Sequence, residues 1–313
     1  MNTAAIPTNR KRTVAIVGAG VAGLSAARHL RQHGLAVRVF EKSRGLGGRS
    51  ATRRANGLSF DHGAQYFTVR DPRMAEVVTS LEERGGVARW EPRVVRLNAD
   101  GSWSGATDSE RYVGVPGMSA LGAALAGDTP VLTGTRIESI RPTGDGEWKL
   151  ASAEGPLVET YAAVIVSCPP AQSADLLEGV APALADACRE VRMLPCWAAM
   201  VAFEETLDVG FDAAFIEDRT LAWAARESSK PGRRGLPECW TLHASPPWSE
   251  ERLEDDRDVL GESLLNRFLD LTGSAPVSAI HLTAHRWRFA RSADPRRLDP
   301  VVDPGAPIAL AGD

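Results

Sequence analysis

The 313-residue sequence predicts an α/β protein, in which a parallel sheet covered by helices is interleaved with a second part made of a mixed sheet and helices. Two observations predict this fold. The first is a strand, turn, helix, turn and strand between residues 13 and 40, a length typical of a βαβ unit. The second is a continuously apolar run at 164–166, typical of a strand buried on both faces of a sheet. A last apolar run at 307–310 is expected to join the same sheet.

The N-terminal unit begins with a short apolar run at 13–17, the first strand, which leads into a glycine-rich turn. Residues 21–32 then carry small and apolar side chains at helical spacing, which predicts a helix with one buried face. Gly34 is suited to end that helix, and the apolar run at 36–40 is the second strand. Two strands joined through a helix in this way are expected to lie parallel in one sheet.

The later elements follow more irregular patterns. Asp71 can cap a helix over 72–83, whose first residue is a proline. A hairpin turn is expected at 143–146, and two prolines at 169–170 end a strand. A long amphipathic helix is expected over 254–271. Further strands are expected at 131–133, 136–141, 147–152, 162–167, 197–203, 221–225, 239–244 and 280–289, with a short helix at 117–126.

Composition and charge argue against several classes of function. A net charge of −4 gives no reason to expect nucleic acid or an anionic membrane as a partner. The longest apolar runs are strand-sized, so no membrane span is expected, and the first twelve residues lack the apolar region of a signal peptide. The four cysteines and six histidines show no metal-ligand spacing, so no metal is expected. A cytoplasmic location is the expectation.

The turn after the first strand has the GxGxxG spacing of a dinucleotide-binding loop and reads Gly18, Ala19, Gly20, Val21, Ala22, Gly23. Gly18 suits a tight turn, Gly20 lets the backbone approach a pyrophosphate, and Gly23 allows close packing of helix on strand. Glu41 ends the second strand, where an acidic side chain accepts hydrogen bonds from a ribose diol. We therefore predict a bound dinucleotide, the alternative being a glycine-rich turn without a ligand.

A second glycine-rich loop directly follows Glu41 and favours FAD over NAD. It runs from Lys42 to Arg49, and its glycines, Gly48 among them, allow close backbone approach to the far side of a pyrophosphate. Arg49 can neutralise phosphate charge there. Plain NAD dehydrogenases usually lack such a segment, and a mobile surface loop is the alternative interpretation.

These elements predict two interleaved domains rather than two sequential ones. A Rossmann-type FAD-binding domain is expected to comprise residues 1–69, 111–169 and 300–313. A substrate domain of mixed sheet and helices is expected to comprise residues 70–110 and 170–299. Ile137 is a candidate for contacting the adenine through its backbone, with an ordinary strand position as the alternative.

The sequence resembles the glutathione-reductase-like flavoproteins of the amine oxidase type and, more narrowly, the renalase family of bacterial type. The N-terminal motifs, including Glu41-Lys42-Ser43-Arg44-Gly45 and Gly48-Arg49, are shared by many flavoproteins. More selective are DHGAQYFT at 61–68, GVPGMS at 114–119, SKPGR at 229–233, WTLHA at 240–244 and AHRW at 284–287. The resemblance covers the chain from Val14 onward.

The resemblance implies a two-domain flavoenzyme with the isoalloxazine ring at the domain interface. Members of the family oxidise dihydronicotinamide dinucleotides reduced at ring position 2 or 6, passing hydride to flavin N5. O₂ then reoxidises the flavin and gives H₂O₂, and the product is NAD(P)⁺. Such a substrate already carries a transferable hydride, so we expect no catalytic acid or base. The expected partners are the small-molecule dinucleotide and O₂, and nothing indicates the oligomeric state.

Further cofactor contacts follow from the same resemblance. Ala64 and Gln65 are expected near the flavin, and Gly312 and Asp313 near the ribityl or pyrophosphate region. The family pattern continues beyond this Gly-Asp pair into a loop and helix. The expectation is therefore that the sequence is truncated or that its affinity for FAD is compromised.

Five residues are candidates for the substrate pocket: Gln65, Tyr66, Glu227, His243 and Trp287. Gln65 and Tyr66 lie either under the flavin ring or in ordinary sheet packing. His243 either bonds a carboxamide or flavin oxygen or is a satisfied core histidine. Trp287 either stacks on the substrate or fills the core. Glu227 stands where related sequences can carry an amide, and it either contacts the substrate or faces solvent.

Two other functions stay open at this stage. A flavin-containing amine oxidase or related desaturase is one, although amine oxidases often place tyrosines around the substrate nitrogen. The three tyrosines here all lie in the first half of the chain, and Lys230 sits in a Lys-Pro-Gly turn. The other is a non-catalytic or weakly FAD-binding homologue. A basic run at 286–291 either receives a substrate diphosphate or is a solvated face.

Overall fold

The computed structural model describes residues 13–106, 109–233, 235, 237–275, 277–294 and 301–312, and the chain divides into two compact units. Unit 1 draws on the ranges 1–44, 126–190 and 297–312. Unit 2 draws on 45–125 and 191–296. Each unit therefore contains segments that are far apart in the sequence.

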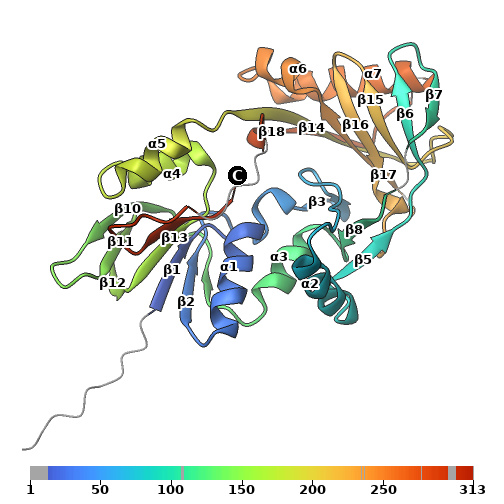
Figure 1. Cartoon of the computed structure of the whole chain (residues 1–313). Helices are drawn as coiled ribbons and strands as arrows, with labels where there is room; N and C mark the ends of the chain where they lie inside the picture. Colours follow the sequence, from blue (N-terminus) through green and yellow to red (C-terminus); the bar gives the residue numbers. More distant parts are fainter. Residues whose placement is uncertain are drawn as a thin grey trace, which may run out of the picture. The chain divides into compact units, whose positions relative to one another are not determined.

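Unit 1 is built on a five-stranded parallel sheet with the order β19-β13-β1-β2-β9 (Figure 1). Its strands are β1 (Thr13–Val17), β2 (Ala36–Phe40), β9 (Val131–Leu132), β13 (Ala163–Val166) and β19 (Ile308–Leu310). The expected βαβ unit is confirmed, with α1 (Val21–Gln32) packed against β1 and β2. The expected sharing of this sheet is also confirmed, because Val164 pairs with both Ala15 and Ile308.

A three-stranded antiparallel sheet completes the strands of unit 1. It consists of β10 (Ile137–Pro142), β11 (Trp148–Ser152) and β12 (Gly155–Tyr161). Helices α4 (Pro170–Leu177) and α5 (Pro182–Arg189) pack against each other, and α4 contacts β10 (Figure 1). Strand β12 was not predicted, because it begins with Gly-Pro and places an exposed valine, Val158, beside the exposed Glu159 and Thr160, so it lacks the apolar alternation of a half-buried strand.

Unit 2 is built on a seven-stranded mixed sheet with the order β18-β14-β17-β16-β15-β6-β7. Its strands are β6 (Val94–Asn98), β7 (Trp103–Gly105), β14 (Met193–Phe203), β15 (Ala213–Glu217), β16 (Leu221–Arg226), β17 (Glu238–Ala244) and β18 (His281–Ser292). The pair β15–β6 is parallel and the other pairs are antiparallel.

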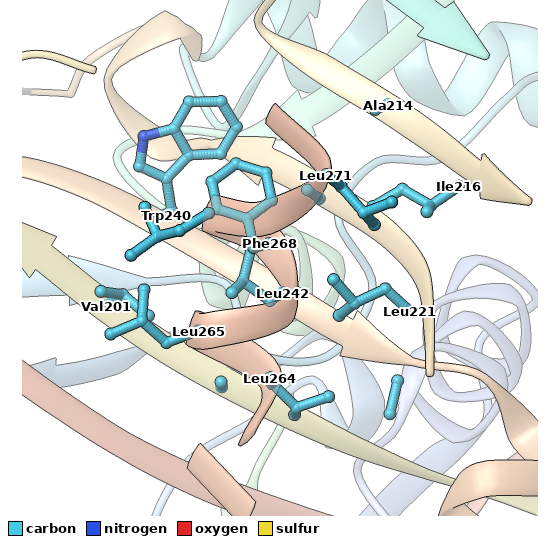
Figure 2. Packing of buried hydrophobic residues seen from close by; sticks show 14 of the residues in the cluster. Val201, Ala214, Ile216, Leu221, Trp240, Leu242, Leu264, Leu265, Phe268 and Leu271 are labelled. Carbon is cyan, nitrogen blue, oxygen red and sulfur yellow. The ribbon is translucent and has the colours of Figure 1, made fainter. Parts of the chain in front are cut away.

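The core of unit 2 lies between this sheet and the long helix α7 (Arg257–Thr272). Phe268 of α7 packs on Trp240 of β17, with ring centroids 5.1 Å apart (Figure 2). Asp256 caps the helix by accepting hydrogen bonds from the backbone N–H groups of residues 258 and 259. A short helix, α6 (Pro246–Glu251), packs against β14.

Three of the predicted site residues, Gly48, Arg49 and Glu227, lie in the remaining elements of unit 2. These elements are η1 (Gly48–Ser50), β3 (Arg53–Ala55), β4 (Leu58–Phe60), α2 (Pro72–Glu83), β5 (Val87–Trp90), β8 (Arg111–Gly114), α3 (Ser119–Ala126) and η2 (Glu227–Ser229). The predicted cap of α2 is confirmed, since the Asp71 side chain accepts from the N–H of Arg73. Phe67 and Tyr112 exchange backbone hydrogen bonds of 2.9 Å, which joins the 61–68 motif to β8.

The two units differ from the predicted domains in two respects. The prediction assigned residues 170–190 to the substrate domain, whereas compact packing groups them with unit 1. It also assigned residues 45–69 and 111–125 to the FAD-binding domain, whereas compact packing groups them with unit 2. The packing of the units does not reveal which residues contact a cofactor. The division into an FAD-binding domain and a substrate domain therefore remains a proposal. None of the helices in the described ranges is long and apolar enough to cross a membrane.

Candidate active site

The glycine-rich turn of unit 1 has the geometry of a phosphate-binding loop. Gly18 has a φ of 109°, and its N–H donates to the carbonyl of Phe40 over 2.8 Å. A Cβ on Gly23 would lie 2.1 Å from the Gly18 oxygen and 2.4 Å from the Ser167 hydroxyl, so only glycine fits there. A Cβ on Gly20 would meet nothing within 4 Å. The space beside Gly20, at the start of α1, is therefore open to a ligand.

The N-terminus of α1 supports the same interpretation. Gly20 is the cap residue, and no side chain caps the helix. The first N–H groups of a helix have no partner within it, and they carry partial positive charge. An anionic pyrophosphate satisfies both features, so the residues present fit the predicted dinucleotide.

Glu41 braces the glycine turn in this structure. Its buried carboxylate accepts from the backbone N–H of Ala19 and from that of Ser43, each over 2.8 Å. Each oxygen keeps further acceptor capacity for a ribose hydroxyl, so the predicted contact stays compatible with this geometry. The neighbouring Lys42 is exposed and donates to the side chain of Gln172.

Two other cofactor candidates of unit 1 lie at its strands. Ile137 buries its side chain in the core with Trp148 and Leu150, which leaves its backbone for the predicted adenine contact. Gly312 follows β19 with a φ of 137°. Asp313 lies outside the described residues.

The second glycine-rich loop belongs to unit 2 and is packed against the start of α3. A Cβ on Gly122 would lie 2.7 Å from the N and Cα of Gly47, so the two backbones touch. Gly48 opens the single turn η1. The Arg49 guanidinium donates to the carbonyl of Ala290 over 3.2 Å, and the Arg49 carbonyl accepts from the N–H of Ala64 over 2.8 Å.

Four buried charged side chains meet at the first residue of the 61–68 motif. We call them the charged cluster: Asp61, Glu227, Lys230 and Arg233. The Lys230 ammonium lies 3.2 Å from the Asp61 carboxylate and 3.1 Å from that of Glu227. It also donates to the Gln65 amide oxygen over 3.0 Å. Arg233 donates to Asp61 over 2.6 Å. Two cations thus balance two carboxylates.

The two carboxylates respond differently to this burial. Burial alone raises the pKa of Asp61, but Lys230, Arg233 and hydrogen bonds from Thr52 and Met118 outweigh it, so that pKa is lowered. The pKa of Glu227 is raised, because burial and the Asp61 charge outweigh its cationic neighbours. Glu227 therefore holds a proton more readily than Asp61 does.

The charged cluster changes the interpretation of the predicted residues Glu227 and Gln65, and it shows that Lys230 is buried. Glu227 is 1% exposed, so the expectation that it faces solvent is wrong. Its carboxylate accepts from the Thr241 hydroxyl over 2.8 Å and from the N–H of Asp61 over 3.1 Å. Gln65 is committed to Lys230 and to the Asp61 carbonyl. Lys230 was missed as a buried group, because a Lys-Pro-Gly segment predicts an exposed turn.

Three histidines and a tryptophan form a second group, the histidine cluster: His62, His243, His285 and Trp287. The Trp287 indole donates to the His62 carbonyl over 2.8 Å, and His243 Nε2 lies 3.2 Å from the same oxygen. The His62 ring centroid lies 4.8 Å from that of His285 and 5.1 Å from that of Trp287. His243 and Trp287 thus both contact the His62 carbonyl oxygen.

Burial keeps these histidines uncharged. It lowers the pKa of His62 to about 3, with further contributions from His285 and Arg53. It lowers the pKa of His243 and of His285 to about 4 each. Near neutral pH the histidine cluster therefore offers neutral imidazoles, not cationic acids.

The histidine cluster predicts a loss of stability in acid. As pH falls below about 6.5, the unfolded chain takes up protons that the folded chain refuses, so the free energy of unfolding falls from pH 7 to pH 4. Each such histidine contributes a slope of about 1.4 kcal/mol per pH unit. Urea unfolding measures the free energy of unfolding across this pH range. In His62→Asn, the slope of that free energy against pH should be smaller by about the contribution of one histidine. The exposed His33→Asn is the control, and an unchanged slope in His62→Asn would contradict the assignment.

Tyr66 has aromatic and cationic neighbours. Its ring centroid lies 5.5 Å from that of Trp223 and 6.1 Å from that of Trp90. The Arg111 guanidinium carbon lies 5.3 Å from the centre of the same ring. The half-buried Tyr66 is therefore an aromatic contact point beside a cation.

The basic run at 286–291 is partly neutralised in the structure. Arg286 and Arg288 each lie 2.6 Å from the Glu254 carboxylate. This pairing favours the expected solvated face over a diphosphate site. In the described part of the chain, no group of three or more His, Cys, Asp or Glu side chains is arranged to hold a metal ion.

Comparison with known proteins gives matches over most of the chain. Residues 16–81 match the model of an NAD(P)-binding Rossmann-like domain, and residues 93–288 match that of flavin-containing amine oxidoreductases. Protoporphyrinogen oxidase 2 of Arabidopsis thaliana is 41% identical over 70 residues, 22% of this chain and 14% of that protein. The zeta-carotene-forming phytoene desaturase of Myxococcus xanthus is 46% identical over 52 residues, 17% of this chain and 10% of that protein. These matches thus span a small part of the relatives' own lengths.

Solved structures share the fold at low sequence identity. Putrescine oxidase bound to putrescine superposes with a TM-score of 0.74 at 13% identity, covering 96% of this chain and 93% of that one. Cyclohexylamine oxidase from Brevibacterium oxydans IH-35A gives a TM-score of 0.72 at 12% identity, with the same coverage. The predicted fold class and FAD cofactor are thereby confirmed. Because the second family model matches more than half of the sequence, the chain belongs to the flavin-containing amine oxidoreductase family.

Proposed function

We propose that the protein is an FAD-dependent oxidase of the renalase type, acting in the cytoplasm on dihydronicotinamide dinucleotides reduced at ring position 2 or 6. In the balanced reaction, one dihydro-NAD(P), one O₂ and one proton give one NAD(P)⁺ and one H₂O₂. FAD, when bound, supplies the hydride acceptor and passes the electrons to O₂. We assign the glycine turn 18–23 and Glu41 of unit 1 to its binding, while the contacts expected of Gly48, Arg49 and Ala64 stay predictions.

One observation carries this proposal: among the described residues, the carboxylates and imidazoles beside the predicted pocket residues are already paired or have lowered pKa values, so none is a ready general base. The imidazoles of the histidine cluster have lowered pKa values. The carboxylates of Asp61 and Glu227 are paired with Lys230 and Arg233. A protonated amine must lose a proton before it can release hydride, whereas a dihydronicotinamide needs no base. The site therefore suits a substrate that needs binding and orientation alone.

The neutral histidine cluster supplies matching recognition. A nicotinamide carboxamide is uncharged and offers both a donor and an acceptor. Each neutral imidazole likewise has one donor and one acceptor nitrogen. Trp287, held by its hydrogen bond to the His62 carbonyl, adds a flat aromatic surface for a ring.

An amine oxidase is the second candidate, and the aromatic neighbours of Tyr66 favour it. Aromatic faces attract cationic amines, and Trp90 and Trp223 both lie beside that ring. The Arg111 cation already lies over the ring, however, and would repel an ammonium group.

Steady-state turnover of the holoenzyme separates the two candidates. We expect 2- or 6-dihydro-NAD to consume O₂ and to yield H₂O₂ and NAD⁺ in equal amounts. Ordinary 4-dihydro-NADH should react much more slowly, and putrescine and cyclohexylamine should not react. Amine-dependent O₂ consumption without any reaction of the dihydro-NAD isomers would replace this proposal with the amine oxidase.

A further inference from the structure

We propose that Arg111 and Trp223 form a subsite for a phosphate group, beside the ring of Tyr66 in unit 2. The proposal rests on the function above for the identity of the ligand, which is a phosphate of the dinucleotide substrate. The subsite itself is argued from two buried hydrogen-bond donors that have no partner.

Arg111 is a buried cation without a counter-ion. It lies on β8 and is 4% exposed. Its Nη1 donates to the carbonyl of Ser109 over 3.0 Å, while its buried Nε has no hydrogen-bond partner. No carboxylate among the described residues forms an ion pair with it. A buried charge left unpaired is costly, so such a group points to an anion that is bound in the working protein.

Trp223 supplies the second donor. It lies on β16, is 7% exposed, and its buried indole N–H also has no hydrogen-bond partner. Buried tryptophans usually place this N–H on an acceptor. The Trp223 ring and the Arg111 guanidinium both contact the ring of Tyr66, at 5.5 Å and 5.3 Å. A charged donor and a neutral donor therefore both lie beside one half-buried ring.

Other arginines that lie over aromatic rings in unit 2 show why Arg111 is unusual. Four of them also pair with an acid: Arg96 with Glu217, Arg226 with Glu238, Arg252 with Glu251 and Arg286 with Glu254. Arg93 over Trp103 is exposed, so water solvates its charge. Arg111 combines burial with the lack of an acidic partner. An arginine with a purely structural role does not need to be both buried and without an acidic partner.

The chemistry of the two donors selects the ligand. A guanidinium presents its N–H groups in one plane, which matches two oxygens of a phosphate. The indole N–H can bond a further oxygen of the same group. A cationic amine is repelled by Arg111, so the subsite also discriminates against amines as substrates.

Direct binding of inorganic pyrophosphate to the holoenzyme tests the subsite without turnover. In isothermal titration, Arg111→Gln should weaken pyrophosphate binding by about 10- to 100-fold, the usual effect of losing a charged hydrogen bond. Trp223→Phe keeps the ring, loses the donor and should weaken binding less. Arg93→Gln is the matched control, since it also removes an arginine over a ring, and its binding should equal that of the wild type. Equal binding by wild type and Arg111→Gln would overturn the proposal.

A substrate series then links the subsite to the reaction. Arg111→Gln should raise KM for 6-dihydro-NAD by a similar factor, with kcat little changed. For dihydronicotinamide riboside, which has no phosphate, KM should be unchanged. A rise in KM for both substrates would place Arg111 at the nicotinamide end and would contradict a phosphate subsite. Arg111→Lys keeps the charge and should recover part of the affinity.

Two further results separate a structural role of Arg111, and a failure of the proposed function, from the phosphate subsite. A binding residue with an unpaired charge need not stabilise the empty protein, so we expect Tm of ligand-free Arg111→Gln to equal or exceed that of the wild type. A lowered Tm together with unchanged pyrophosphate binding would make Arg111 a structural residue. If pyrophosphate binding depends on Arg111 but no dihydronicotinamide is oxidised, the proposed function fails while the subsite stands.

Discussion

Gly20→Ala is expected to weaken FAD binding by about 5- to 150-fold while leaving the apoprotein as stable as the wild type. A Cβ at Gly20 meets no protein atom within 4 Å, so the folded chain accommodates it. The backbone there, with φ −74° and ψ 177°, is also allowed for alanine. The added methyl group would instead occupy the space that we assign to the pyrophosphate. Flavin absorbance after reconstitution measures the affinity, and urea unfolding of the apoprotein measures the stability.

Gly23→Ala should behave differently from Gly20→Ala. Its Cβ would lie 2.1 Å from the Gly18 carbonyl oxygen, so α1 must move away from the turn. We expect a loss of about 3 kcal/mol or more in the free energy of unfolding, together with loss of FAD. Gly179→Ala is the control, because Gly179 is exposed in unit 1 and its Cβ would meet nothing within 4 Å. Full FAD binding by Gly20→Ala would contradict the assigned pyrophosphate position.

Lys230→Met should cost about 3–5 kcal/mol in the free energy of unfolding, because it leaves Asp61 and Glu227 buried with Arg233 as their only charged partner in the cluster. The Lys230 side chain is 0% exposed, so water cannot replace it without rearrangement. Urea unfolding at pH 7 measures the loss. Lys149→Met, which removes an exposed lysine, should change stability by less than about 0.5 kcal/mol.

A double substitution tests whether Lys230 acts through its partner carboxylate. Glu227→Gln keeps the shape of that side chain and removes its charge. In the double variant with Lys230→Met, one cation and one anion are lost together, so we expect a cost about 0.5–3 kcal/mol smaller than the sum of the two single costs. Additive costs would show that Lys230 and Glu227 do not form the pair described here.

Local patterns in the sequence were sufficient to predict the βαβ unit of unit 1 and two further strands of its parallel sheet. Its strands are short apolar runs, and its first turn has a glycine spacing that few other structures require. The sharing of one sheet by Val164 and Ile308 was predictable for the same reason. Strand β12 was not predicted, because its apolar residues do not alternate with polar ones and its Val158 is exposed.

The site was less predictable, because its interactions join segments far apart in the chain. Asp61 meets Lys230 and Arg233 across about 170 residues, and only the fold brings them together. Arg111 could not be identified as a candidate from the sequence. Its lack of a counter-ion depends on which side chains the fold places around it. Glu227 was singled out as unusual, but its burial could not be predicted from its position beside a turn.

Anaerobic mixing of the holoenzyme with purified 6-dihydro-NAD is the most direct test of the central claim. The account predicts that the flavin absorbance bleaches within milliseconds to seconds, while 4-dihydro-NADH and putrescine act far more slowly or not at all. A flavin that stays oxidised with both the 2- and 6-dihydro isomers, yet bleaches with an amine, would contradict it.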